Sequence, residues 1–207
     1  MTDDSGAVAT EIDSGPLPEG SADGARPMRA DARRNYERLI AAAKLVFARQ
    51  GGGASMEAIA KEAGVGAGTL YRHFPTRIDL VEAVYRDEVD KLVSDAETFV
   101  AELSPWDAMV SWLQAFVRYT SSKRTFLSEL HEAFEKNPEL RVKARDRIES
   151  AIDIVLVPAQ QAGVVRTDLD GSDLMQLILS MCMSATLTKE QSSRLLLVIQ
   201  DGLRPPQ

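Results

Sequence analysis

Cysteine and long apolar runs are the two features that this sequence most clearly lacks. It holds one cysteine, Cys182, so no disulfide can form within the chain, which favours a cytoplasmic location. No stretch approaches the ~18 consecutive apolar residues that a membrane-spanning helix needs, and the N-terminus has no secretory signal. We therefore expect a cytoplasmic protein without a membrane partner, in which Cys182 is a small core residue.

The sequence also lacks the residue patterns of a catalytic or metal site. It has two histidines, His73 and His131, and neither can be assigned as the base of a Ser or Cys nucleophile. The glycine triplet at 51–53 is not followed by the Lys-Ser/Thr pair of a phosphate-binding loop, and no metal-ligand spacing occurs. These absences predict a protein that is not an enzyme and that uses no metal or cofactor.

Basic residues are missing from the first 25 positions, which hold six acidic residues. Residues 26–77 hold ten basic and four acidic residues, a net charge of +6, although the whole chain carries −7. Positive charge concentrated in one segment is what a DNA-binding face requires. Residues 1–28 are rich in Gly, Ser, Asp and Pro and are predicted to form a disordered acidic tail.

Two short helices joined by a tight turn are predicted between Met56 and Arg77. Ser55 is a good N-cap for the first helix, and Gly64 stands where the chain must adopt a left-handed conformation. The small side chain of Ala60 lets the second helix cross closely. A small residue, a turn glycine and later aliphatic side chains at these spacings are typical of a helix-turn-helix motif.

The second helix, from about Ala67 to Phe74, is predicted to carry a DNA-contacting face. Leu70 and Phe74 point inward at helical spacing, and Pro75 ends the helix. An ordinary helical hairpin with exposed polar side chains is the alternative. The residues predicted to contact DNA are Ser55, Ala67, Gly68, Thr69, Tyr71, Arg72, His73 and Arg77, with Arg33 and Arg34 in a basic arm that is equally well explained as solvated charge.

Residues 35–80 resemble the DNA-binding domain of the tetracycline-repressor (TetR) family. The matching parts are the helix ending in LVFARQG, the hairpin SMEAIAKEAGV and the recognition helix GTLYRHF. One departure is Gly66, where family members often carry a serine that caps the recognition helix. The resemblance implies a homodimer that binds a palindromic operator and is released when a small molecule enters its C-terminal body.

The rest of the chain is predicted to be helical. Periodic apolar residues predict a long helix over Ile78–Leu103, roughly 39 Å long at 1.5 Å per residue, and the last two helices over Asp170–Ser184 and Thr188–Gly202. We therefore expect an all-α protein. Its N-terminal three-helix helix-turn-helix head spans residues 29–77, and its C-terminal helical-bundle body, for ligand binding and dimerisation, spans residues 78–207.

The body supplies the candidate residues for the ligand and for the partner copy. The candidate ligand-binding residues can alternatively be explained as plain core packing. The candidate dimer residues can alternatively be explained as completing a monomeric bundle. Candidate ligand-binding residues are Trp106, Met109, Trp112, Phe116, Phe126, Leu130, His131 and Phe134. The last two helices carry more apolar residues than one core needs, and the candidate dimer interface comprises Leu174, Leu177, Ile178, Met181, Leu195, Val198 and Ile199.

The predicted function is a TetR-like homodimeric regulator of transcription. Its predicted partners are double-stranded DNA with a palindromic operator, a second copy of itself, and an apolar or aromatic effector with few charges. Two alternatives stay open. One is a helical small-molecule-binding enzyme that carries a DNA-binding head, against which the missing catalytic set argues. The other is an effector-independent regulator, or an activator, whose body serves only for dimerisation.

Overall fold

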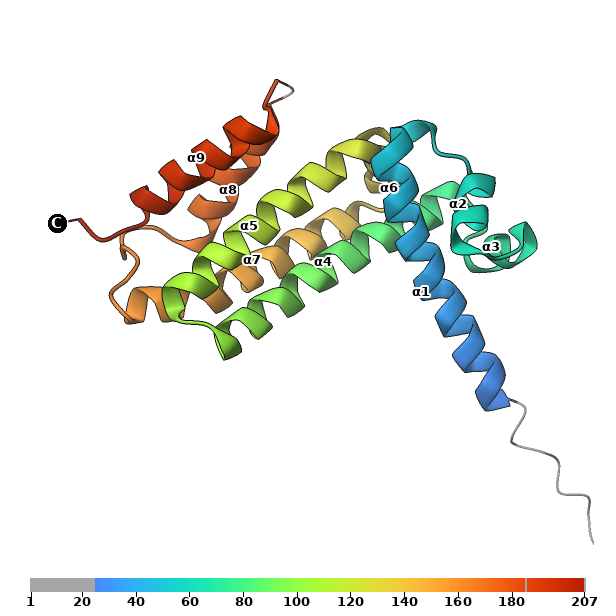
Figure 1. The fold of residues 1–207 in the computed structure, drawn as a ribbon, viewed down its shortest axis with the longest axis horizontal. Helices are drawn as coiled ribbons and strands as arrows, with labels where there is room; N and C mark the ends of the chain where they lie inside the picture. The colour runs from blue at the N-terminus through green and yellow to red at the C-terminus, as the bar shows by residue number, and fades with distance from the viewer. Residues whose placement is uncertain (1–24, 185, 207) are drawn as a thin grey trace, which may run out of the picture. The chain divides into compact units, whose positions relative to one another are not determined.

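The computed structural model describes residues 25–184 and 186–206, where the secondary structure consists of helices without any β-strand (Figure 1). Residues 1–24, most of the predicted acidic tail, lie outside the described residues. The first helix, α1 (Ala25–Gln50), begins inside the segment 1–28 that the sequence predicted to be a disordered tail. The chain divides into two compact units after Arg34, so the first turns of α1 are described separately from everything that follows.

The helix-turn-helix pair consists of α2 (Met56–Ala63) and α3 (Ala67–His73). The Ser55 hydroxyl oxygen accepts a hydrogen bond of 3.1 Å from the Ala58 amide, which caps α2. Gly64 ends α2 with φ of +62°, a conformation that an L side chain rarely adopts. Both helix-turn-helix signals in the sequence are therefore confirmed.

A small apolar core holds this pair against the part of α1 that follows Asn35. A single 3₁₀ turn, η1 (Gly51–Gly53), connects α1 to the segment that leads into α2. Leu39, Phe47, Ile59, Leu70 and Phe74 are each at most 3% exposed and belong to this core. Their burial fixes which face of α3 is left outside.

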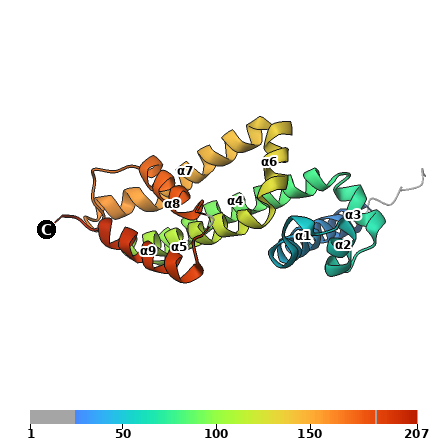
Figure 2. The same cartoon turned by 90° about the horizontal axis from the view of Figure 1, so that it is seen from above.

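Three long helices, α4 (Arg77–Glu102), α5 (Pro105–Lys123) and α7 (Pro138–Gln161), lie side by side in the centre of the body (Figures 1 and 2). Thr76 and Asp79 form a reciprocal capping box at the start of α4. Prolines occupy the first turns of α5 and α7, where a missing amide proton costs nothing.

Two shorter elements, η2 (Arg124–Phe126) and α6 (Leu127–Lys136), connect α5 to α7. The long helix α4 matches its predicted span within one residue at each end. Leu80, Val84 and Leu92 lie on its buried side. Leu103, the last residue of the predicted span, follows the end of the helix and is 40% exposed.

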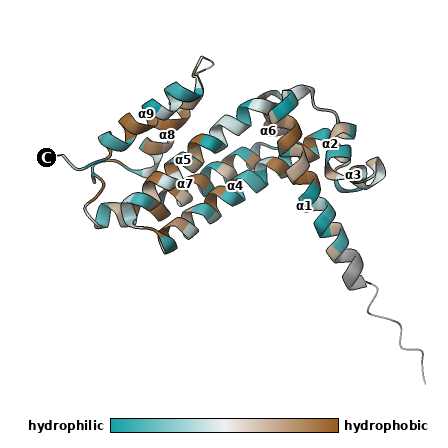
Figure 3. Ribbon diagram, in the orientation of Figure 1, coloured by the Kyte–Doolittle hydropathy of each residue, from teal (hydrophilic) through white to brown (hydrophobic). Residues whose placement is uncertain are grey.

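The last two helices, α8 (Gly171–Cys182) and α9 (Lys189–Gly202), complete the body. Figure 2 shows α8 beside α7, and α9 lies along α5. Both helices begin with capping boxes, and both show hydrophobic stretches in Figure 3. Cys182 is buried, as expected for a core residue. Within the described part of the chain, no helix is long and apolar enough to cross a membrane.

Candidate DNA-binding face and body cavity

The outer face of α3 is open to solvent. Ala67, Gly68, Tyr71 and Arg72 are exposed, and Thr69 is half-buried. Leu70 is fully buried on the opposite side. The structure thus gathers most of the predicted DNA-contacting residues on one helix face, with Ser55 exposed at the start of α2.

Two members of that set have partners within the protein. The Tyr71 hydroxyl donates a hydrogen bond of 3.2 Å to Glu57, and repulsion by that carboxylate raises the pKa of Tyr71. The His73 ring meets Tyr36 edge-on, with 6.1 Å between ring centroids. His73 is therefore a half-buried packing residue as well as a member of the face.

The two arginines of the predicted basic arm, Arg33 and Arg34, lie in the separate N-terminal unit. Both are exposed, and Arg34 forms an ion pair with Asp31 one turn away on the same helix. An exposed pair of this kind is worth little in stability, so it leaves Arg34 able to exchange partners.

The sequence suggested that Arg77 lies free beside α3 to contact DNA. In the structure its side chain contacts other parts of the protein. Its guanidinium donates to the carbonyl oxygen of Ala54, to that of Gly52 at 2.8 Å, and to the Glu129 carboxylate at 2.8 Å. It also stacks over the Phe47 ring, 5.3 Å from the centroid. The Arg77 side chain is only 26% exposed, and within the protein it joins α4 to η1, α1 and α6, a role that the sequence did not predict.

Glu129 is the acidic partner in that junction. Its side chain is 13% exposed, and burial by itself opposes ionisation. Hydrogen bonds from Arg77 and Ser128 outweigh this effect and lower the pKa of Glu129. The carboxylate stays charged at neutral pH and holds the start of α4 against α6.

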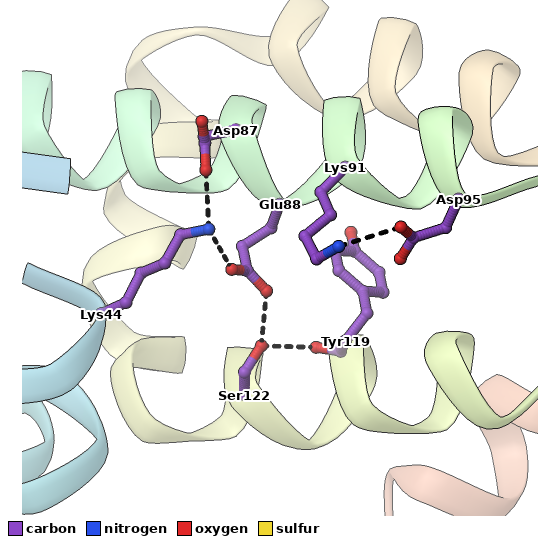
Figure 4. Close-up of polar contacts among 7 residues, drawn as sticks. All are labelled: Lys44, Asp87, Glu88, Lys91, Asp95, Tyr119 and Ser122. Atoms are coloured by element: carbon purple, nitrogen blue, oxygen red, sulfur yellow. Dashed lines mark hydrogen bonds and ion pairs between the residues drawn. The ribbon is translucent and has the colours of Figure 1, made fainter. Parts of the chain in front are cut away.

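A second polar junction joins α1 to the body (Figure 4). The Lys44 ammonium lies 2.6 Å from Asp87 and 2.5 Å from Glu88 on α4. Burial works against the charge of Lys44, but the hydrogen bonds to both carboxylates outweigh it and raise the pKa of the lysine. Glu88 also accepts a hydrogen bond of 3.1 Å from Ser122 on α5. Three helices are thus linked by one chain of contacts.

A cavity of about 340 Å³ lies among α4, α5, α6, α7 and α8. Its floor includes the buried side chains of Tyr85, Phe116 and Tyr119, and exposed residues such as Leu127 and His131 stand at its rim. This volume is near the lower end of the range for small-molecule sites. A larger space of about 710 Å³ beside α9 is lined mostly by exposed polar side chains, which do not suit an apolar ligand.

Three of the eight candidate ligand residues line the cavity: Phe116, His131 and Phe134. Met109, Trp112, Phe126 and Leu130 are at most 3% exposed within the apolar core, and Trp106 packs under the guanidinium of Arg204. These five do not line the cavity. Trp112 also donates its indole N–H to the Leu92 carbonyl oxygen at 3.0 Å, which satisfies a buried donor.

The candidate dimer residues differ in their exposure to solvent. Leu174 and Ile178 are at most 1% exposed and pack inside the chain's own core, so they offer no surface to a partner in this structure. Leu177, Leu195 and Val198 are 43–66% exposed, and Met181 and Ile199 are half-buried. The outer faces of α8 and α9 therefore retain large apolar side chains in contact with solvent.

The cavity residues that the sequence reading missed include Tyr85, Tyr119, Lys123 and Arg141. A search for stripes of Phe and Trp does not select them, because they are polar and come from three different helices. The available signal was weak: Tyr119 and Lys123 are four residues apart, which places them on one face of a helix.

Two family models match the chain. Residues 39–84 match the bacterial regulatory proteins of the tetR family, and residues 104–205 match the C-terminal domain of SbtR-like transcriptional regulators. The HTH-type transcriptional regulator UidR of Escherichia coli K12 is 23% identical over 158 residues, which cover 74% of this chain and 81% of that protein.

Solved structures agree with these matches. A TetR transcriptional regulator from Streptomyces coelicolor is 35% identical with a TM-score of 0.75, over 83% of this chain and 99% of that one. A TetR regulator from Mycobacterium vanbaalenii is 36% identical with a TM-score of 0.68, over 86% and 99%. Family members are typically DNA-binding repressors with ligand-binding C-terminal domains, and they typically form dimers. The resemblance and the all-α fold class are confirmed, and this chain belongs to the TetR family of helix-turn-helix transcriptional regulators.

Proposed function

We propose that the protein is a homodimeric repressor that binds a palindromic operator through α3 and leaves it when a small ligand occupies the body cavity. The observation that carries the proposal is the outer face of α3, which the core leaves open to solvent. In a dimer, two such helices reach successive major grooves when the half-site centres are about 34–36 Å apart.

Gly68 supports an interface with DNA over a plain helical hairpin. Glycine inside a helix is less favourable than alanine by about 1 kcal/mol. A Cβ atom built at Gly68 would meet no heavy atom within 4 Å, so the packing of the chain does not require glycine there. A bare backbone at this position lets α3 approach a groove wall closely.

Replacement of Arg72 by alanine is the first test of the DNA-binding face. Arg72 is exposed at the end of α3, where a phosphate would lie, so its loss should weaken binding to all sequences and reduce the salt slope by about one. Thr69→Ala should instead change the base preference. Fluorescence anisotropy against an operator library at several salt concentrations measures both effects.

The matched control is Lys143→Ala, which removes an exposed cation from the body and should leave operator affinity unchanged. If Arg72→Ala and Lys143→Ala have the same effect, α3 is not the DNA-binding helix.

Dimerisation through α8 and α9 is the second element of the proposal. Five of the thirteen large, exposed hydrophobic side chains of the described residues lie on these helices or directly after α8: Leu177, Met183, Leu195, Leu197 and Val198. Such a concentration favours a partner surface over scattered exposure. A second copy of the chain is the occupant that a two-fold operator requires.

Replacement of Leu195 and Val198 by glutamate should convert the dimer to monomers. Each carboxylate would be buried at the interface without a cation, so we expect at least a tenfold rise in the dimer dissociation constant. Val142→Glu on α7 is the control, because Val142 is 59% exposed outside the proposed interface. Light scattering that still finds a dimer for the double variant would place the interface elsewhere.

Two junctions connect the proposed ligand site to the DNA-binding helices. Helix α6 supplies His131 and Phe134 to the cavity and Glu129 to Arg77. Helix α5 supplies Lys123 to the cavity, and the adjacent Ser122 joins Glu88 and Lys44. A ligand that fits one arrangement of α5 and α6 better than another would shift the heads through these contacts.

A further inference from the structure

The cavity carries positive charge without a matching carboxylate. Lys123, Arg141 and Arg145 line it together with His131, and none of the lining residues is acidic. Arg145 is paired with Glu149, at 3.0 Å, and His131 lies 3.6 Å from Glu135, so both have carboxylates outside the cavity. The two cations that remain for a ligand are Lys123 and Arg141.

Lys123 differs from every other half-buried basic residue in the described part of the chain. Lys44 pairs with Asp87 and Glu88, Arg77 with Glu129, and Arg166 with Asp168. Lys123 forms no such pair. Its ammonium lies 5.0 Å from the ring centroid of Tyr85 and 5.2 Å from that of Tyr119. Aromatic faces stabilise a cation only partly, so its charge is left without a counterion.

The hydroxyl of Tyr119 is a second group without its normal partner. Tyr119 is 4% exposed, and its hydroxyl makes no hydrogen bond of normal geometry within the described residues. The Tyr85 hydroxyl is near enough to affect the pKa of both rings, whose centroids are 6.5 Å apart, but it does not replace a well-aligned partner. A buried hydroxyl without a partner is costly, and native proteins rarely retain one. Because Tyr119 lines the cavity beside Lys123, a bound acceptor oxygen would serve both groups.

The rest of the cavity is apolar. Phe116, Ile148 and Met175 are at most 5% exposed and supply hydrocarbon and ring surface to its lining. A volume of about 340 Å³ suits one or two fused rings or a short acyl chain. Apolar side chains and unpaired cations in one cavity define the chemistry of the occupant.

We propose that the cavity binds an amphipathic organic anion. Its acidic group lies against Lys123 and Arg141 within reach of the Tyr119 hydroxyl, and its apolar body lies along Phe116, Ile148 and Met175. This inference rests on the proposed function, in which this cavity is the effector site. It replaces the expectation from the sequence of an effector with few charges, because Lys123 and Arg141 line the cavity.

The test uses two dyes that share an apolar body and differ in charge. 8-Anilinonaphthalene-1-sulfonate is an anion, and N-phenyl-1-naphthylamine is its neutral counterpart; binding of each to the full chain is followed by fluorescence. We expect Lys123→Met to weaken the anionic dye tenfold or more, because a charge-assisted contact is lost. The neutral dye should bind the variant at least as tightly as the wild type.

Lys91→Met is the matched control, because Lys91 is exposed on α4 and pairs with Asp95 outside the cavity. Equal loss of both dyes in Lys123→Met, or an unchanged affinity for the anion, would overturn the proposal of an anion site. The anionic dye could also bind in a way that depends on Lys123 without changing the affinity of the protein for its operator. That result would support the anion site and refute the proposed release of the operator by a ligand.

Discussion

Replacement of Arg77 by methionine is expected to lower the free energy of unfolding by about 3 kcal/mol, because it leaves the Glu129 carboxylate buried without a cation. The Glu129 side chain is 13% exposed, so water can repay only a small part of the lost interaction. The carbonyl oxygens of Gly52 and Ala54 lose their donor as well. Operator binding should also weaken, since Arg77 fixes the turn that leads into α2.

Chemical denaturation measures the stability, and a double-mutant cycle with Glu129→Gln isolates the pair. Glu129→Gln should cost less in the Arg77→Met background than in the wild type. Arg86→Met is the control: its ion pair with Glu82 leaves Arg86 58% exposed, so its loss should cost no more than about 1 kcal/mol. A loss for Arg77→Met as small as that of the control would show that the junction is dispensable.

The ion pair between Arg77 and Glu129 also predicts that the free energy of unfolding depends on pH. The folded-state pKa of Glu129 is depressed, so its stabilising contribution is present above the unfolded value of about 4.5. That contribution is lost as the pH falls through the lower folded-state pKa. The difference in stability between the wild type and Arg77→Met should therefore be largest near neutral pH and shrink in acid.

The helix-turn-helix was predictable because its signals are local. Ser55 caps the helix that begins at the next residue. Gly64 ends that helix with a positive φ, and a single glycine in the sequence is enough to indicate such a position. Leu70 and Phe74 follow from helical periodicity within a single short segment. Each of these inferences needs no knowledge of a distant partner.

The role of Arg77 was not predictable in that way. Its acceptors belong to Gly52 and Glu129, which are 25 and 52 residues away in the sequence, and only the packed fold brings them together. A basic residue just after a recognition helix looks the same in sequence whether it meets a phosphate or a buried carboxylate. Burial decides between the two, and burial is a property of the tertiary structure.

The cavity was mispredicted for a related reason. Helical spacing identifies Trp112 and Phe116 as inward-facing, but both core and cavity residues face inward. Trp112 fills the core, whereas Phe116 borders empty space with residues from four other helices. The unpaired state of Lys123 depends on which groups surround it after folding, so no sequence pattern reports it.

Replacement of Lys123 by methionine should stabilise the protein in the absence of any ligand. Burial, and then repulsion by Arg141, lower the pKa of Lys123 to about 8 from 10.5. At neutral pH both the folded and the unfolded states carry the charge, and that shift corresponds to a cost of about 3 kcal/mol in the folded state. Methionine fills a similar volume without the charge, so Tm should rise by roughly 5 °C or more at fixed protein concentration.

Lys44→Met is the matched control, and its expected effect on stability has the opposite sign. Lys44 is half-buried like Lys123, but its charge is paired with Asp87 and Glu88 and its pKa is raised. The same substitution there should destabilise the protein below pH 10. Two lysine-to-methionine changes in one protein thus separate the effect of an unpaired charge from that of a lysine side chain as such.

The pH profile of the Lys123→Met variant completes the test. The groups that face Lys123 are Tyr85 and Tyr119 on α4 and α5, His131 on α6, and Arg141 and Arg145 on α7, while the nearby Glu88 is held by Lys44. Because the folded pKa of Lys123 is the lower one, the unfolded state binds more protons between about pH 8 and 10.5, and wild-type stability rises through that window. The advantage of the variant should therefore be full below pH 8 and vanish near pH 10.5. An advantage that stays constant from pH 7 to pH 10, measured by urea denaturation, would mean that Lys123 is solvated or paired, and the cavity would then hold no unpaired cation for an anion to meet.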